Sequence, residues 1–152
     1  MARVKIRFPD KKELYTATIT VRIGDINYGN HVGNDAILSI VHEARMQMLA
    51  AFGYTELNAA GTSLIMADVM IAYKGEAFYG DVLTIKLYAE ELGTVSFDLL
   101  YHITTIRNGS VKEIAHCKTG MACFNYDTRK TVAITDELKN LLTGELSIRM
   151  NS

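Results

Sequence analysis

A single strong helical pattern in the first three quarters of the chain, over residues 34–52, most constrains the fold. Asn34 or Asp35 can serve as the N-cap, and Gly53 is a natural C-terminal stop. The apolar residues recur along one helix face: Ile37, Ile40, Val41, Ala44, Met48, Ala51 and Phe52. A helix with one apolar face must bury that face against another apolar surface. The segments that follow must supply this surface.

Those other segments carry strand patterns instead. They alternate in polarity or are rich in β-branched residues, and they cover residues 15–22, 63–73, 82–92, 95–106 and 111–124. The segment 63–73 is nearly continuous in apolar character, so we expect a strand buried on both faces. Asn108-Gly109 predicts a two-residue hairpin, because both residues tolerate the positive φ of a type I′ turn.

This order of elements predicts an α+β fold. We expect an antiparallel curved sheet of about five strands wrapped around one long central helix. The core of the fold should cover about residues 13–127, followed by a short C-terminal helix at about 135–143. Residues 1–152 should form a single domain.

Such a sheet leaves edge strands open, and pairing edges between two subunits protects them. A homodimer is therefore expected, and a dimer of dimers is possible.

The composition is ordinary for a soluble globular protein. Of the 152 residues, 49% are hydrophobic and 22% charged, with a formal net charge of -1. Nucleic acid is not an expected partner, because phosphate binding needs a clustered basic surface and none is present. A membrane is not expected either, since no segment approaches the ~20 apolar residues that span a bilayer. Residues 1–7 alternate charged and apolar residues, unlike a secretory signal.

The cysteines and histidines do not suggest a disulfide bond or a structural metal site. Cys117 and Cys123 lie in one predicted strand, about 20 Å apart at ~3.3 Å per residue, too far to form a disulfide. The chain has two cysteines and four scattered histidines without the spacing of zinc ligands. We therefore expect no metal site and a reducing, cytoplasmic compartment.

Two sets of residues carry a family resemblance. The first is Val21–Asn27, followed by His31–Asn34 and then Glu43-Ala44-Arg45. The second is Tyr73 with Tyr79-Gly80-Asp81 and the strand after it. In order and spacing, over about residues 18–124, they resemble the hot-dog thioesterase superfamily, specifically its 4-hydroxybenzoyl-CoA thioesterase-like branch. The resemblance implies the hot-dog fold and an acyl-CoA thioesterase that uses no cofactor.

One departure from the family pattern bears on the chemistry. The second Asp of the family's Asp-x-Asp pair, often the catalytic carboxylate, aligns with Asn27. The family's Gly before the His aligns with Asn30, and its first Asn after His-Val aligns with Gly33. A carboxamide can orient a water or a carbonyl, but it cannot act as a general base or nucleophile.

The candidate site must therefore find its base elsewhere. Hydrolysis of a thioester needs stabilisation of the oxyanion and an activated water or a carboxylate nucleophile. Backbone amides at Gly33 and Asn34, at the start of the predicted helix, could hold the thioester oxygen. Asp25 in the loop and Glu43 on the helix are the candidate bases, and His31 could bind the carbonyl or share a proton.

Two other functions remain open at this stage. Hot-dog enoyl-CoA hydratases and dehydratases have Asp-x-Asn-Pro-x-His, and Asp25-Ile26-Asn27 followed by His31 is one residue longer and lacks the Pro. The third possibility is a non-catalytic protein that binds acyl-CoA or acyl-carrier thioesters, since Asn27 removes the family's carboxylate. The preferred reading is hydrolysis of an acyl-CoA, or acyl-carrier, thioester to free acid and thiol.

Overall fold

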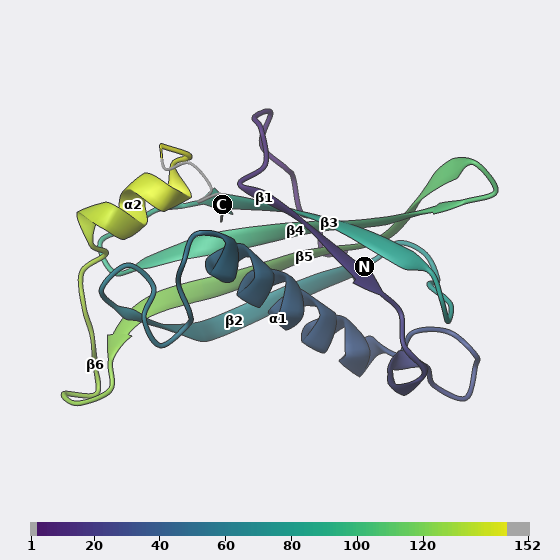
Figure 1. Cartoon of the computed structure of the whole chain (residues 1–152), viewed down its shortest axis with the longest axis horizontal. Helices are drawn as coiled ribbons and strands as arrows, with labels where there is room; N and C mark the ends of the chain where they lie inside the picture. The colour runs from purple at the N-terminus through teal and green to yellow at the C-terminus, as the bar shows by residue number, and fades with distance from the viewer. Residues whose placement is uncertain (1–2, 146–152) are drawn as a thin grey trace.

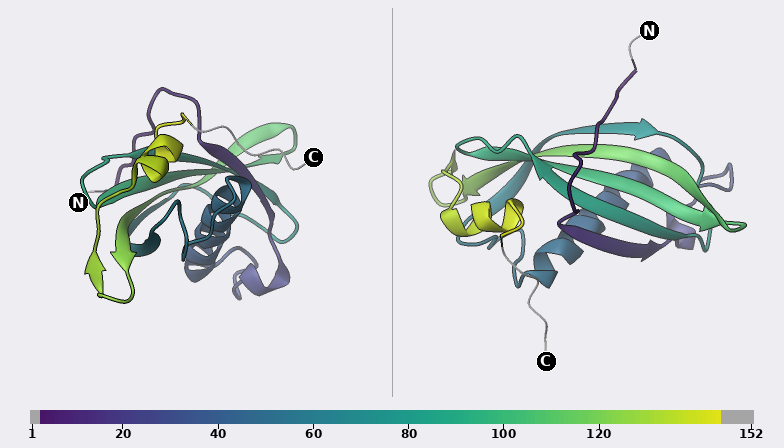
Figure 2. Two further views of the ribbon diagram at one scale, coloured as in Figure 1. Left: turned by 60° about the vertical axis from the view of Figure 1, so that its left-hand side comes forward. Right: turned by 90° about the horizontal axis from the view of Figure 1, so that it is seen from above.

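A computed structural model describes residues 3–145 of the chain. Its elements, in chain order, are β1 (Tyr15–Thr20), the 3-10 turn η1 (Ile23–Asp25), α1 (Asn34–Ala51), β2 (Ser63–Tyr73), β3 (Val82–Glu90), β4 (Ser96–Arg107), β5 (Ser110–Asn125), β6 (Lys130–Thr131) and α2 (Asp136–Leu142). The strands form one antiparallel sheet in the order β1-β3-β4-β5-β2, with β6 paired to β5. Figures 1 and 2 show α1 lying along the concave face of this curved sheet. The predicted architecture is confirmed.

The apolar face of α1 forms one side of the core. Its buried residues include Ile37, Ile40, Val41, Ala44 and Met48. The opposite side comes from alternating positions of the central strands, namely Leu83, Ile85, Leu87, Phe97, Leu99, Tyr101 and Ile103, all at most 2% exposed. The period-2 pattern of the strands and the period-3.6 pattern of the helix thus meet in one apolar layer.

The predicted N-cap of this helix was wrong by one residue. Gly33, not Asn34 or Asp35, is the N-cap, and no side chain caps it. The backbone reason is that Gly33 N–H already donates to Asp25 O (3.0 Å), which fixes Gly33 in an extended conformation just before the first turn. The C-terminal prediction is confirmed, since Gly53 has φ 86° directly after the cap residue Phe52.

The prediction that residues 63–73 are buried on both faces was also wrong. They form β2, an edge strand of the sheet, and Met66, Val69 and Met70 are exposed in the described chain. The register of β2 shifts at a bulge beside Asp68, whose carboxylate accepts hydrogen bonds from Gly120 N–H (2.9 Å) and Lys118 Nζ (2.8 Å). An apolar run therefore identified the strand but not its place in the sheet.

Both cysteines lie in β5 and are free, as the strand spacing predicted, and the structure shows that both are buried. Burial raises the pKa of the Cys117 thiol to about 12, since the thiolate is poorly solvated there. We therefore expect neither thiol to react with a disulfide reagent at neutral pH until the protein unfolds. The reaction is measured with an aromatic disulfide reagent, from the absorbance of the thiolate that it releases, in the presence and absence of urea. Rapid reaction of the native protein would contradict the expectation.

A second bulge interrupts the pairing of β4 with β5, between Ile103 and Thr104. The carbonyl of Ile114 at this bulge accepts both Lys74 N–H (2.9 Å) and Gly75 N–H (3.1 Å). These bonds tie the end of β2 to the bulged part of β5.

Gly75 makes the closest approach at this bulge. A Cβ atom there would lie 2.5 Å from the Glu113 carbonyl oxygen, a backbone atom with little freedom to move. Gly75→Ala should therefore lower the free energy of unfolding by about 1–3 kcal/mol. Urea denaturation measures it, with Gly24→Ala as control, because no atom lies within 4 Å of a Cβ there. Equal effects of the two substitutions would contradict the packing argument.

No helix within residues 3–145 is both long and apolar enough to cross a membrane.

Candidate active site

The segment between β1 and α1 folds into a compact loop. An isolated bridge pairs Ile26 with Val32, and Asn27 N–H donates to His31 O at 3.0 Å. Asn30 takes φ 63° in the turn, a left-handed conformation that Asn tolerates. These backbone bonds give the loop a defined shape at the N-terminal end of α1.

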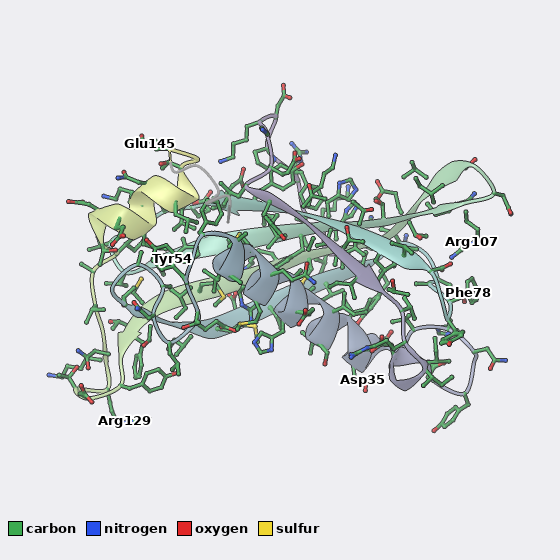
Figure 3. All side chains as sticks on the ribbon, viewed as in Figure 1. Asp35, Tyr54, Phe78, Arg107, Arg129 and Glu145 are labelled. Atoms are coloured by element: carbon green, nitrogen blue, oxygen red, sulfur yellow. The ribbon has the colours of Figure 1, made fainter. Side chains whose placement is uncertain are left out.

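The turn between β2 and β3 braces this loop. Val32 N–H donates to Ala77 O at 2.8 Å. In the same turn, Asp81 Oδ2 accepts a hydrogen bond from Arg107 Nη2 at 2.6 Å, and the Arg107 guanidinium lies 4.8 Å from the centre of the Phe78 ring (Figure 3). The loop that carries the first part of the family resemblance thus meets the Tyr79-Gly80-Asp81 turn, far from it in the sequence, whereas Glu43-Ala44-Arg45 lie farther along α1.

Asp25 holds the beginning of the loop. Its side chain is buried at the end of η1, and Oδ2 accepts Arg22 N–H at 2.9 Å with Arg22 Nε at 3.8 Å. The main-chain oxygen of Asp25 accepts Gly33 N–H. One residue therefore stabilises the turn with its side chain and the entry to α1 with its backbone.

Asn27 and His31 approach each other beside Gly29. Asn27 Oδ1 accepts Gly29 N–H at 2.9 Å. A Cβ atom on Gly29 would lie 3.0 Å from His31 Nε2 and 3.2 Å from Asn27 Oδ1. His31 Nδ1 lies 3.1 Å from Val32 O, a bond in which the ring nitrogen must donate. In the neutral ring this leaves Nε2 as an acceptor next to the Asn27 carboxamide.

Gly33 and Asn34 differ in what their amides can do. The Gly33 amide is engaged by Asp25, whereas the Asn34 amide has no acceptor among residues 3–145. A Cβ atom on Gly33 would lie 2.7 Å from Asp35 Oδ1 and 3.6 Å from Asn27 Cβ, so the loop packs closely against this position. Figure 3 shows Asp35 at the loop end of α1. The Asn34 N–H is thus the amide left for a ligand, aided by the helix dipole.

Both candidate carboxylates line one groove between β1 and α1, with a volume of about 550 Å³. Asp25 is at its β1 side and Glu43 on its α1 side; Glu43 is exposed, and its Oε1 accepts from Gln47 Nε2 at 3.2 Å. The remaining lining residues are Thr18, Ile19, Thr20, Arg22, Ser39, Ile40, His42, Met46 and Gln47. The structure therefore brings Asp25 and Glu43 to one groove, while Asn27, His31 and Gly33 lie in the loop that leads into α1 and Asn34 is the first residue of that helix.

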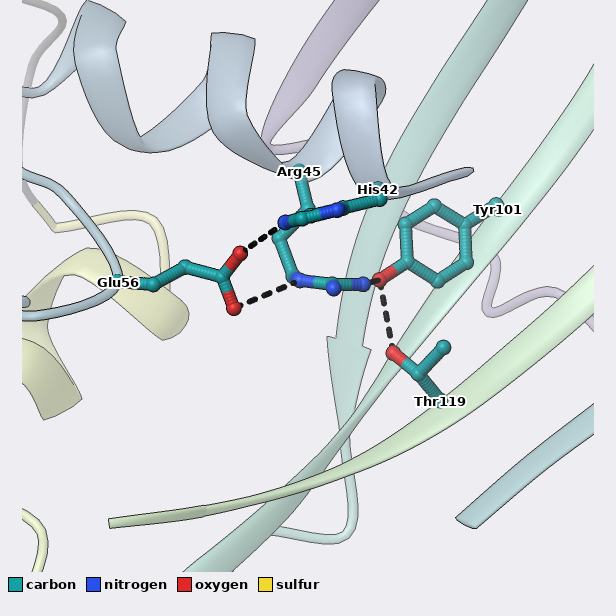
Figure 4. A network of polar contacts seen from close by, with 5 residues as sticks. All are labelled: His42, Arg45, Glu56, Tyr101 and Thr119. Carbon is teal, nitrogen blue, oxygen red and sulfur yellow. Dashed lines mark hydrogen bonds and ion pairs between the residues drawn. The ribbon is translucent and has the colours of Figure 1, made fainter. Parts of the chain in front are cut away.

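A buried polar network under α1 was not anticipated (Figure 4). Arg45 is only 5% exposed, and its Nη1 donates to Tyr101 Oη at 3.0 Å. Tyr101 Oη is 2.7 Å from Thr119 Oγ1, and Arg45 Nε is 3.5 Å from Glu56 Oε2. His42 Nε2 contacts the other oxygen of Glu56 at 2.5 Å. The network joins the helix, the segment after it and two strands of the sheet.

The charge of Arg45 is maintained in spite of its burial. Burial opposes the charged guanidinium, but the nearby Tyr101 hydroxyl and Glu56 carboxylate favour it, so the pKa of Arg45 is raised on balance. Burial also raises the pKa of Tyr101, against the opposing effect of Arg45 and Thr119. At neutral pH the pair is therefore a cation bonded to a neutral phenol.

A small recess opens beside this network. It has a volume of about 240 Å³, and Ser39 and His42 line both the recess and the groove. Its other lining residues are Leu38, Val41, Arg45, Met66 and Thr119. The recess and the groove are therefore neighbours along α1.

Comparison with known proteins identifies the family. The model of the thioesterase-like superfamily matches residues 21–142, which include the loop, α1, strands β2 to β6 and α2. The chain belongs to this superfamily. The expected hot-dog architecture is thereby confirmed by both the family match and the strand order.

Relatives in the superfamily have described activities. A 1,4-dihydroxy-2-naphthoyl-CoA hydrolase from Acaryochloris marina is 29% identical over 126 residues, covering 80% of this chain and 90% of the relative. Long-chain acyl-CoA thioesterase FadM from Escherichia coli is 27% identical over 125 residues, covering 82% and 93%. The crystal structure of a 1,4-dihydroxy-2-naphthoyl-CoA thioesterase from Synechocystis has the same fold, with a TM-score of 0.74 and 20% identity over 85% of this chain and 95% of that one.

Proposed function

We propose that this protein is a thioester hydrolase that cleaves acyl-CoA to free acid and free thiol in the groove between β1 and α1. The observation that carries the proposal is the placement of Asp25 and Glu43 along one groove in a member of the thioesterase-like superfamily. The activities of the two relatives support an acyl-CoA as the substrate.

Glu43 is the proposed general base. It is exposed to the groove and accepts only one hydrogen bond in the described structure, so a carboxylate oxygen remains to take a proton from water. The water oxygen forms a bond to the thioester carbon, the C–S bond breaks, and the proton carried by Glu43 neutralises the departing thiolate.

Asp25 has a different proposed role. Its carboxylate is buried and holds the turn of η1, so we assign it to positioning the loop. Asn27 and His31 lie beside Gly29 in the loop before α1, and we assign them to orienting the bound thioester from that end. The Asn34 amide at the start of α1 is nine residues from Glu43, about 13.5 Å along the helix at ~1.5 Å per residue, too far to bind the oxyanion of the carbonyl that the Glu43-activated water attacks. Its proposed role is to bind another part of the substrate, with Gly33 allowing that part to approach.

A thiol-release assay over short, medium, long and aromatic acyl-CoA esters tests the proposal. We expect release of one thiol per acid formed for at least one acyl class. Hydration of an enoyl-CoA without thiol release would favour the hydratase function instead. Tight binding of the same esters with neither reaction would establish a non-catalytic acyl-thioester binder and overturn the proposal.

We also propose a homodimer formed through the free edge of β2, with pairing into a dimer of dimers as an extension. The edge is apolar as well as unpaired: Met66 is 46% exposed, and Val69 and Met70 are also exposed. A long, exposed apolar edge strand favours association with a second chain.

The proposed partners of this protein are the acyl-CoA substrate and a second copy of the chain. We propose neither nucleic acid nor a membrane as a partner, and we propose the cytoplasm as the compartment.

Charges placed on this edge should separate the subunits. Val69→Lys with Met70→Lys is expected to convert the dimer to a monomer, because two ammonium groups would be buried against the partner strand. Light scattering after size-exclusion chromatography measures the mass. Val111→Lys, at an exposed site in the β4–β5 hairpin, is the matched control and should leave the dimer intact. A monomeric native protein would contradict the proposal.

A further inference from the structure

Two histidines and a glutamate converge on the outer face of the sheet, away from α1. His102 in β4 is paired directly with His116 in β5, and Glu113 precedes His116 by three residues. His102 Nε2 lies 2.7 Å and His116 Nε2 3.6 Å from the same carboxylate oxygen, Oε2 of Glu113. One ligand atom from each of the three residues lies within 4.8 Å of the others.

The bulge in β5 is what brings Glu113 to this face. Residues three apart in a regular strand point to opposite faces, because the side-chain period is two. The register slips here: Ile103 pairs with Ala115 but Thr104 with Glu113, so Ile114 is the extra residue. Bulges re-aim side chains in this way. The N–H groups of Lys74 and Gly75 hold the Ile114 carbonyl, so the β2–β3 turn supports the orientation of Glu113.

The cluster is partly covered and keeps one open side. The side chains of His102 and His116 are 27% and 17% exposed, and that of Glu113 is 50% exposed. Phe8 packs on the rings of His102 (4.7 Å between centroids, stacked) and His116 (5.0 Å, edge-on). Figure 2 shows the N-terminal segment crossing this outer face of the sheet. Phe8 covers a face of the His102 ring, whereas a metal ion would bind in the ring plane at Nε2.

His116 Nε2 is also an unsatisfied polar atom. It is buried and has no hydrogen-bond partner in the described structure, although it points toward Glu113. Such atoms in native proteins call for an explanation, and an ion is one of the usual ones. His102 Nε2 lies within hydrogen-bond distance of the same Glu113 carboxylate. A single ion bound between the three side chains would therefore also give His116 Nε2 a partner.

We propose that His102, Glu113 and His116 form a Zn²⁺ site, with water in the remaining position. Zn²⁺ binds imidazole nitrogen and carboxylate oxygen at about 2.0–2.2 Å with tetrahedral geometry, which places ligand atoms about 3.3 Å apart. The two separations from Glu113, 2.7 and 3.6 Å, lie on either side of this value, and all three ligand atoms lie within 4.8 Å of one another. Side-chain movements of up to about 1.5 Å would therefore complete the geometry. No metal site is expected from the sequence, because the histidines are not spaced along the chain like zinc ligands. Strand pairing brings His102 and His116 together in spite of this spacing.

The site is separate from the groove because it lies on the opposite face of the sheet. A bound ion would join β4, β5 and the bulge beneath the N-terminal segment. Lys74 contributes positive charge near His116 and acts against the ion. Replacing this lysine should therefore tighten binding of Zn²⁺ without touching a ligand.

Calorimetric titration of untagged, chelator-treated protein with Zn²⁺ tests the proposal. We expect one Zn²⁺ per chain, with affinity lowered more than about tenfold by His116→Gln, His102→Gln or Glu113→Gln, since even the loss of outer-shell partners costs 10- to 100-fold. Lys74→Met should raise the affinity severalfold. His42→Gln is the control, because this exposed helix histidine lies outside the cluster. Visible absorbance with Co²⁺ in place of Zn²⁺ should show a four-coordinate spectrum in the native protein only.

Each result decides the proposal. Circular dichroism confirms that a variant is folded, and the Co²⁺ spectrum is compared only between folded proteins. Should the Gln variants unfold, the nitrogen resonances of the native histidines decide: Zn²⁺ must shift those of His102 and His116 and leave His31 and His42 unchanged. Absence of stoichiometric binding to native protein, or binding that survives loss of all three ligands, would overturn the site.

Discussion

Glu43→Gln should lower kcat for acyl-CoA hydrolysis by about 100- to 10,000-fold, the usual contribution of a general base. KM should change little, because glutamine keeps the size of the side chain and its Oε1 can still accept from Gln47. The loss arises because a carboxamide cannot take a proton from the attacking water. Initial rates of thiol release, measured over a range of substrate concentrations, separate kcat from KM.

Two other substitutions make this result interpretable. Glu91→Gln removes an exposed carboxylate at the end of β3, outside the groove, and should leave kcat unchanged. Asp25→Asn should act through the loop, so it is expected to lower stability along with activity, because Asp25 Oδ2 holds the turn of η1. An unchanged kcat for Glu43→Gln, with a large loss for Asp25→Asn at native stability, would transfer the base to Asp25.

Arg45→Met should lower the free energy of unfolding by about 3–5 kcal/mol, although methionine fills much of the same space. Arg45 is buried, and its removal leaves the Tyr101 hydroxyl without its cationic donor and Glu56 without its guanidinium partner, with only His42 remaining beside it. Breaking a buried pair from one side is costly because the other partner stays desolvated. Urea denaturation followed by far-ultraviolet circular dichroism measures the change.

A second substitution should return most of the lost stability. In Arg45→Met with Glu56→Gln, the carboxylate left by the first change is neutralised, so the two effects should not add. Arg22→Met is the matched control: its side chain is 80% exposed and its ion pair with Asp25 is 3.8 Å long, so little change is expected. Full additivity of the Arg45 and Glu56 substitutions would show that the pair is not coupled.

The parts of the fold that depend on local sequence were predicted well. The helix stripe from Ile37 to Phe52, the stop at Gly53 and the hairpin at Asn108-Gly109 each follow from residues close together in the chain, and the structure confirms them. Burial of β2 was mistaken because the position of a strand within a sheet depends on contacts distant in sequence. The N-cap was mistaken because the backbone of Asp25 determines where the chain enters the helix.

The candidate site divides in the same way. Residues Asp25 to Asn34 are near one another in sequence, so their loop could be identified directly, and Glu43 follows within the same helix. The partners of Arg45 come from the pairing of β4 with β5 and from the segment after α1, which no local pattern reveals. An arginine in the middle of an apolar helix face was the available signal, since a buried cation requires partners. The convergence of Glu113 with two histidines additionally depends on a bulge, which shifts side-chain direction without leaving a mark in the residue types.

Hydrolysis itself is tested most directly by carrying out the reaction in oxygen-18 water with the best acyl-CoA from the thiol-release panel. The proposed attack of water on the thioester carbon predicts one oxygen-18 atom in the acid for each thiol released, with both products lost together in Glu43→Gln. Mass spectrometry of the acid and colorimetric measurement of the thiol give the two quantities. Native protein that binds the ester but yields neither labelled acid nor thiol would contradict the account.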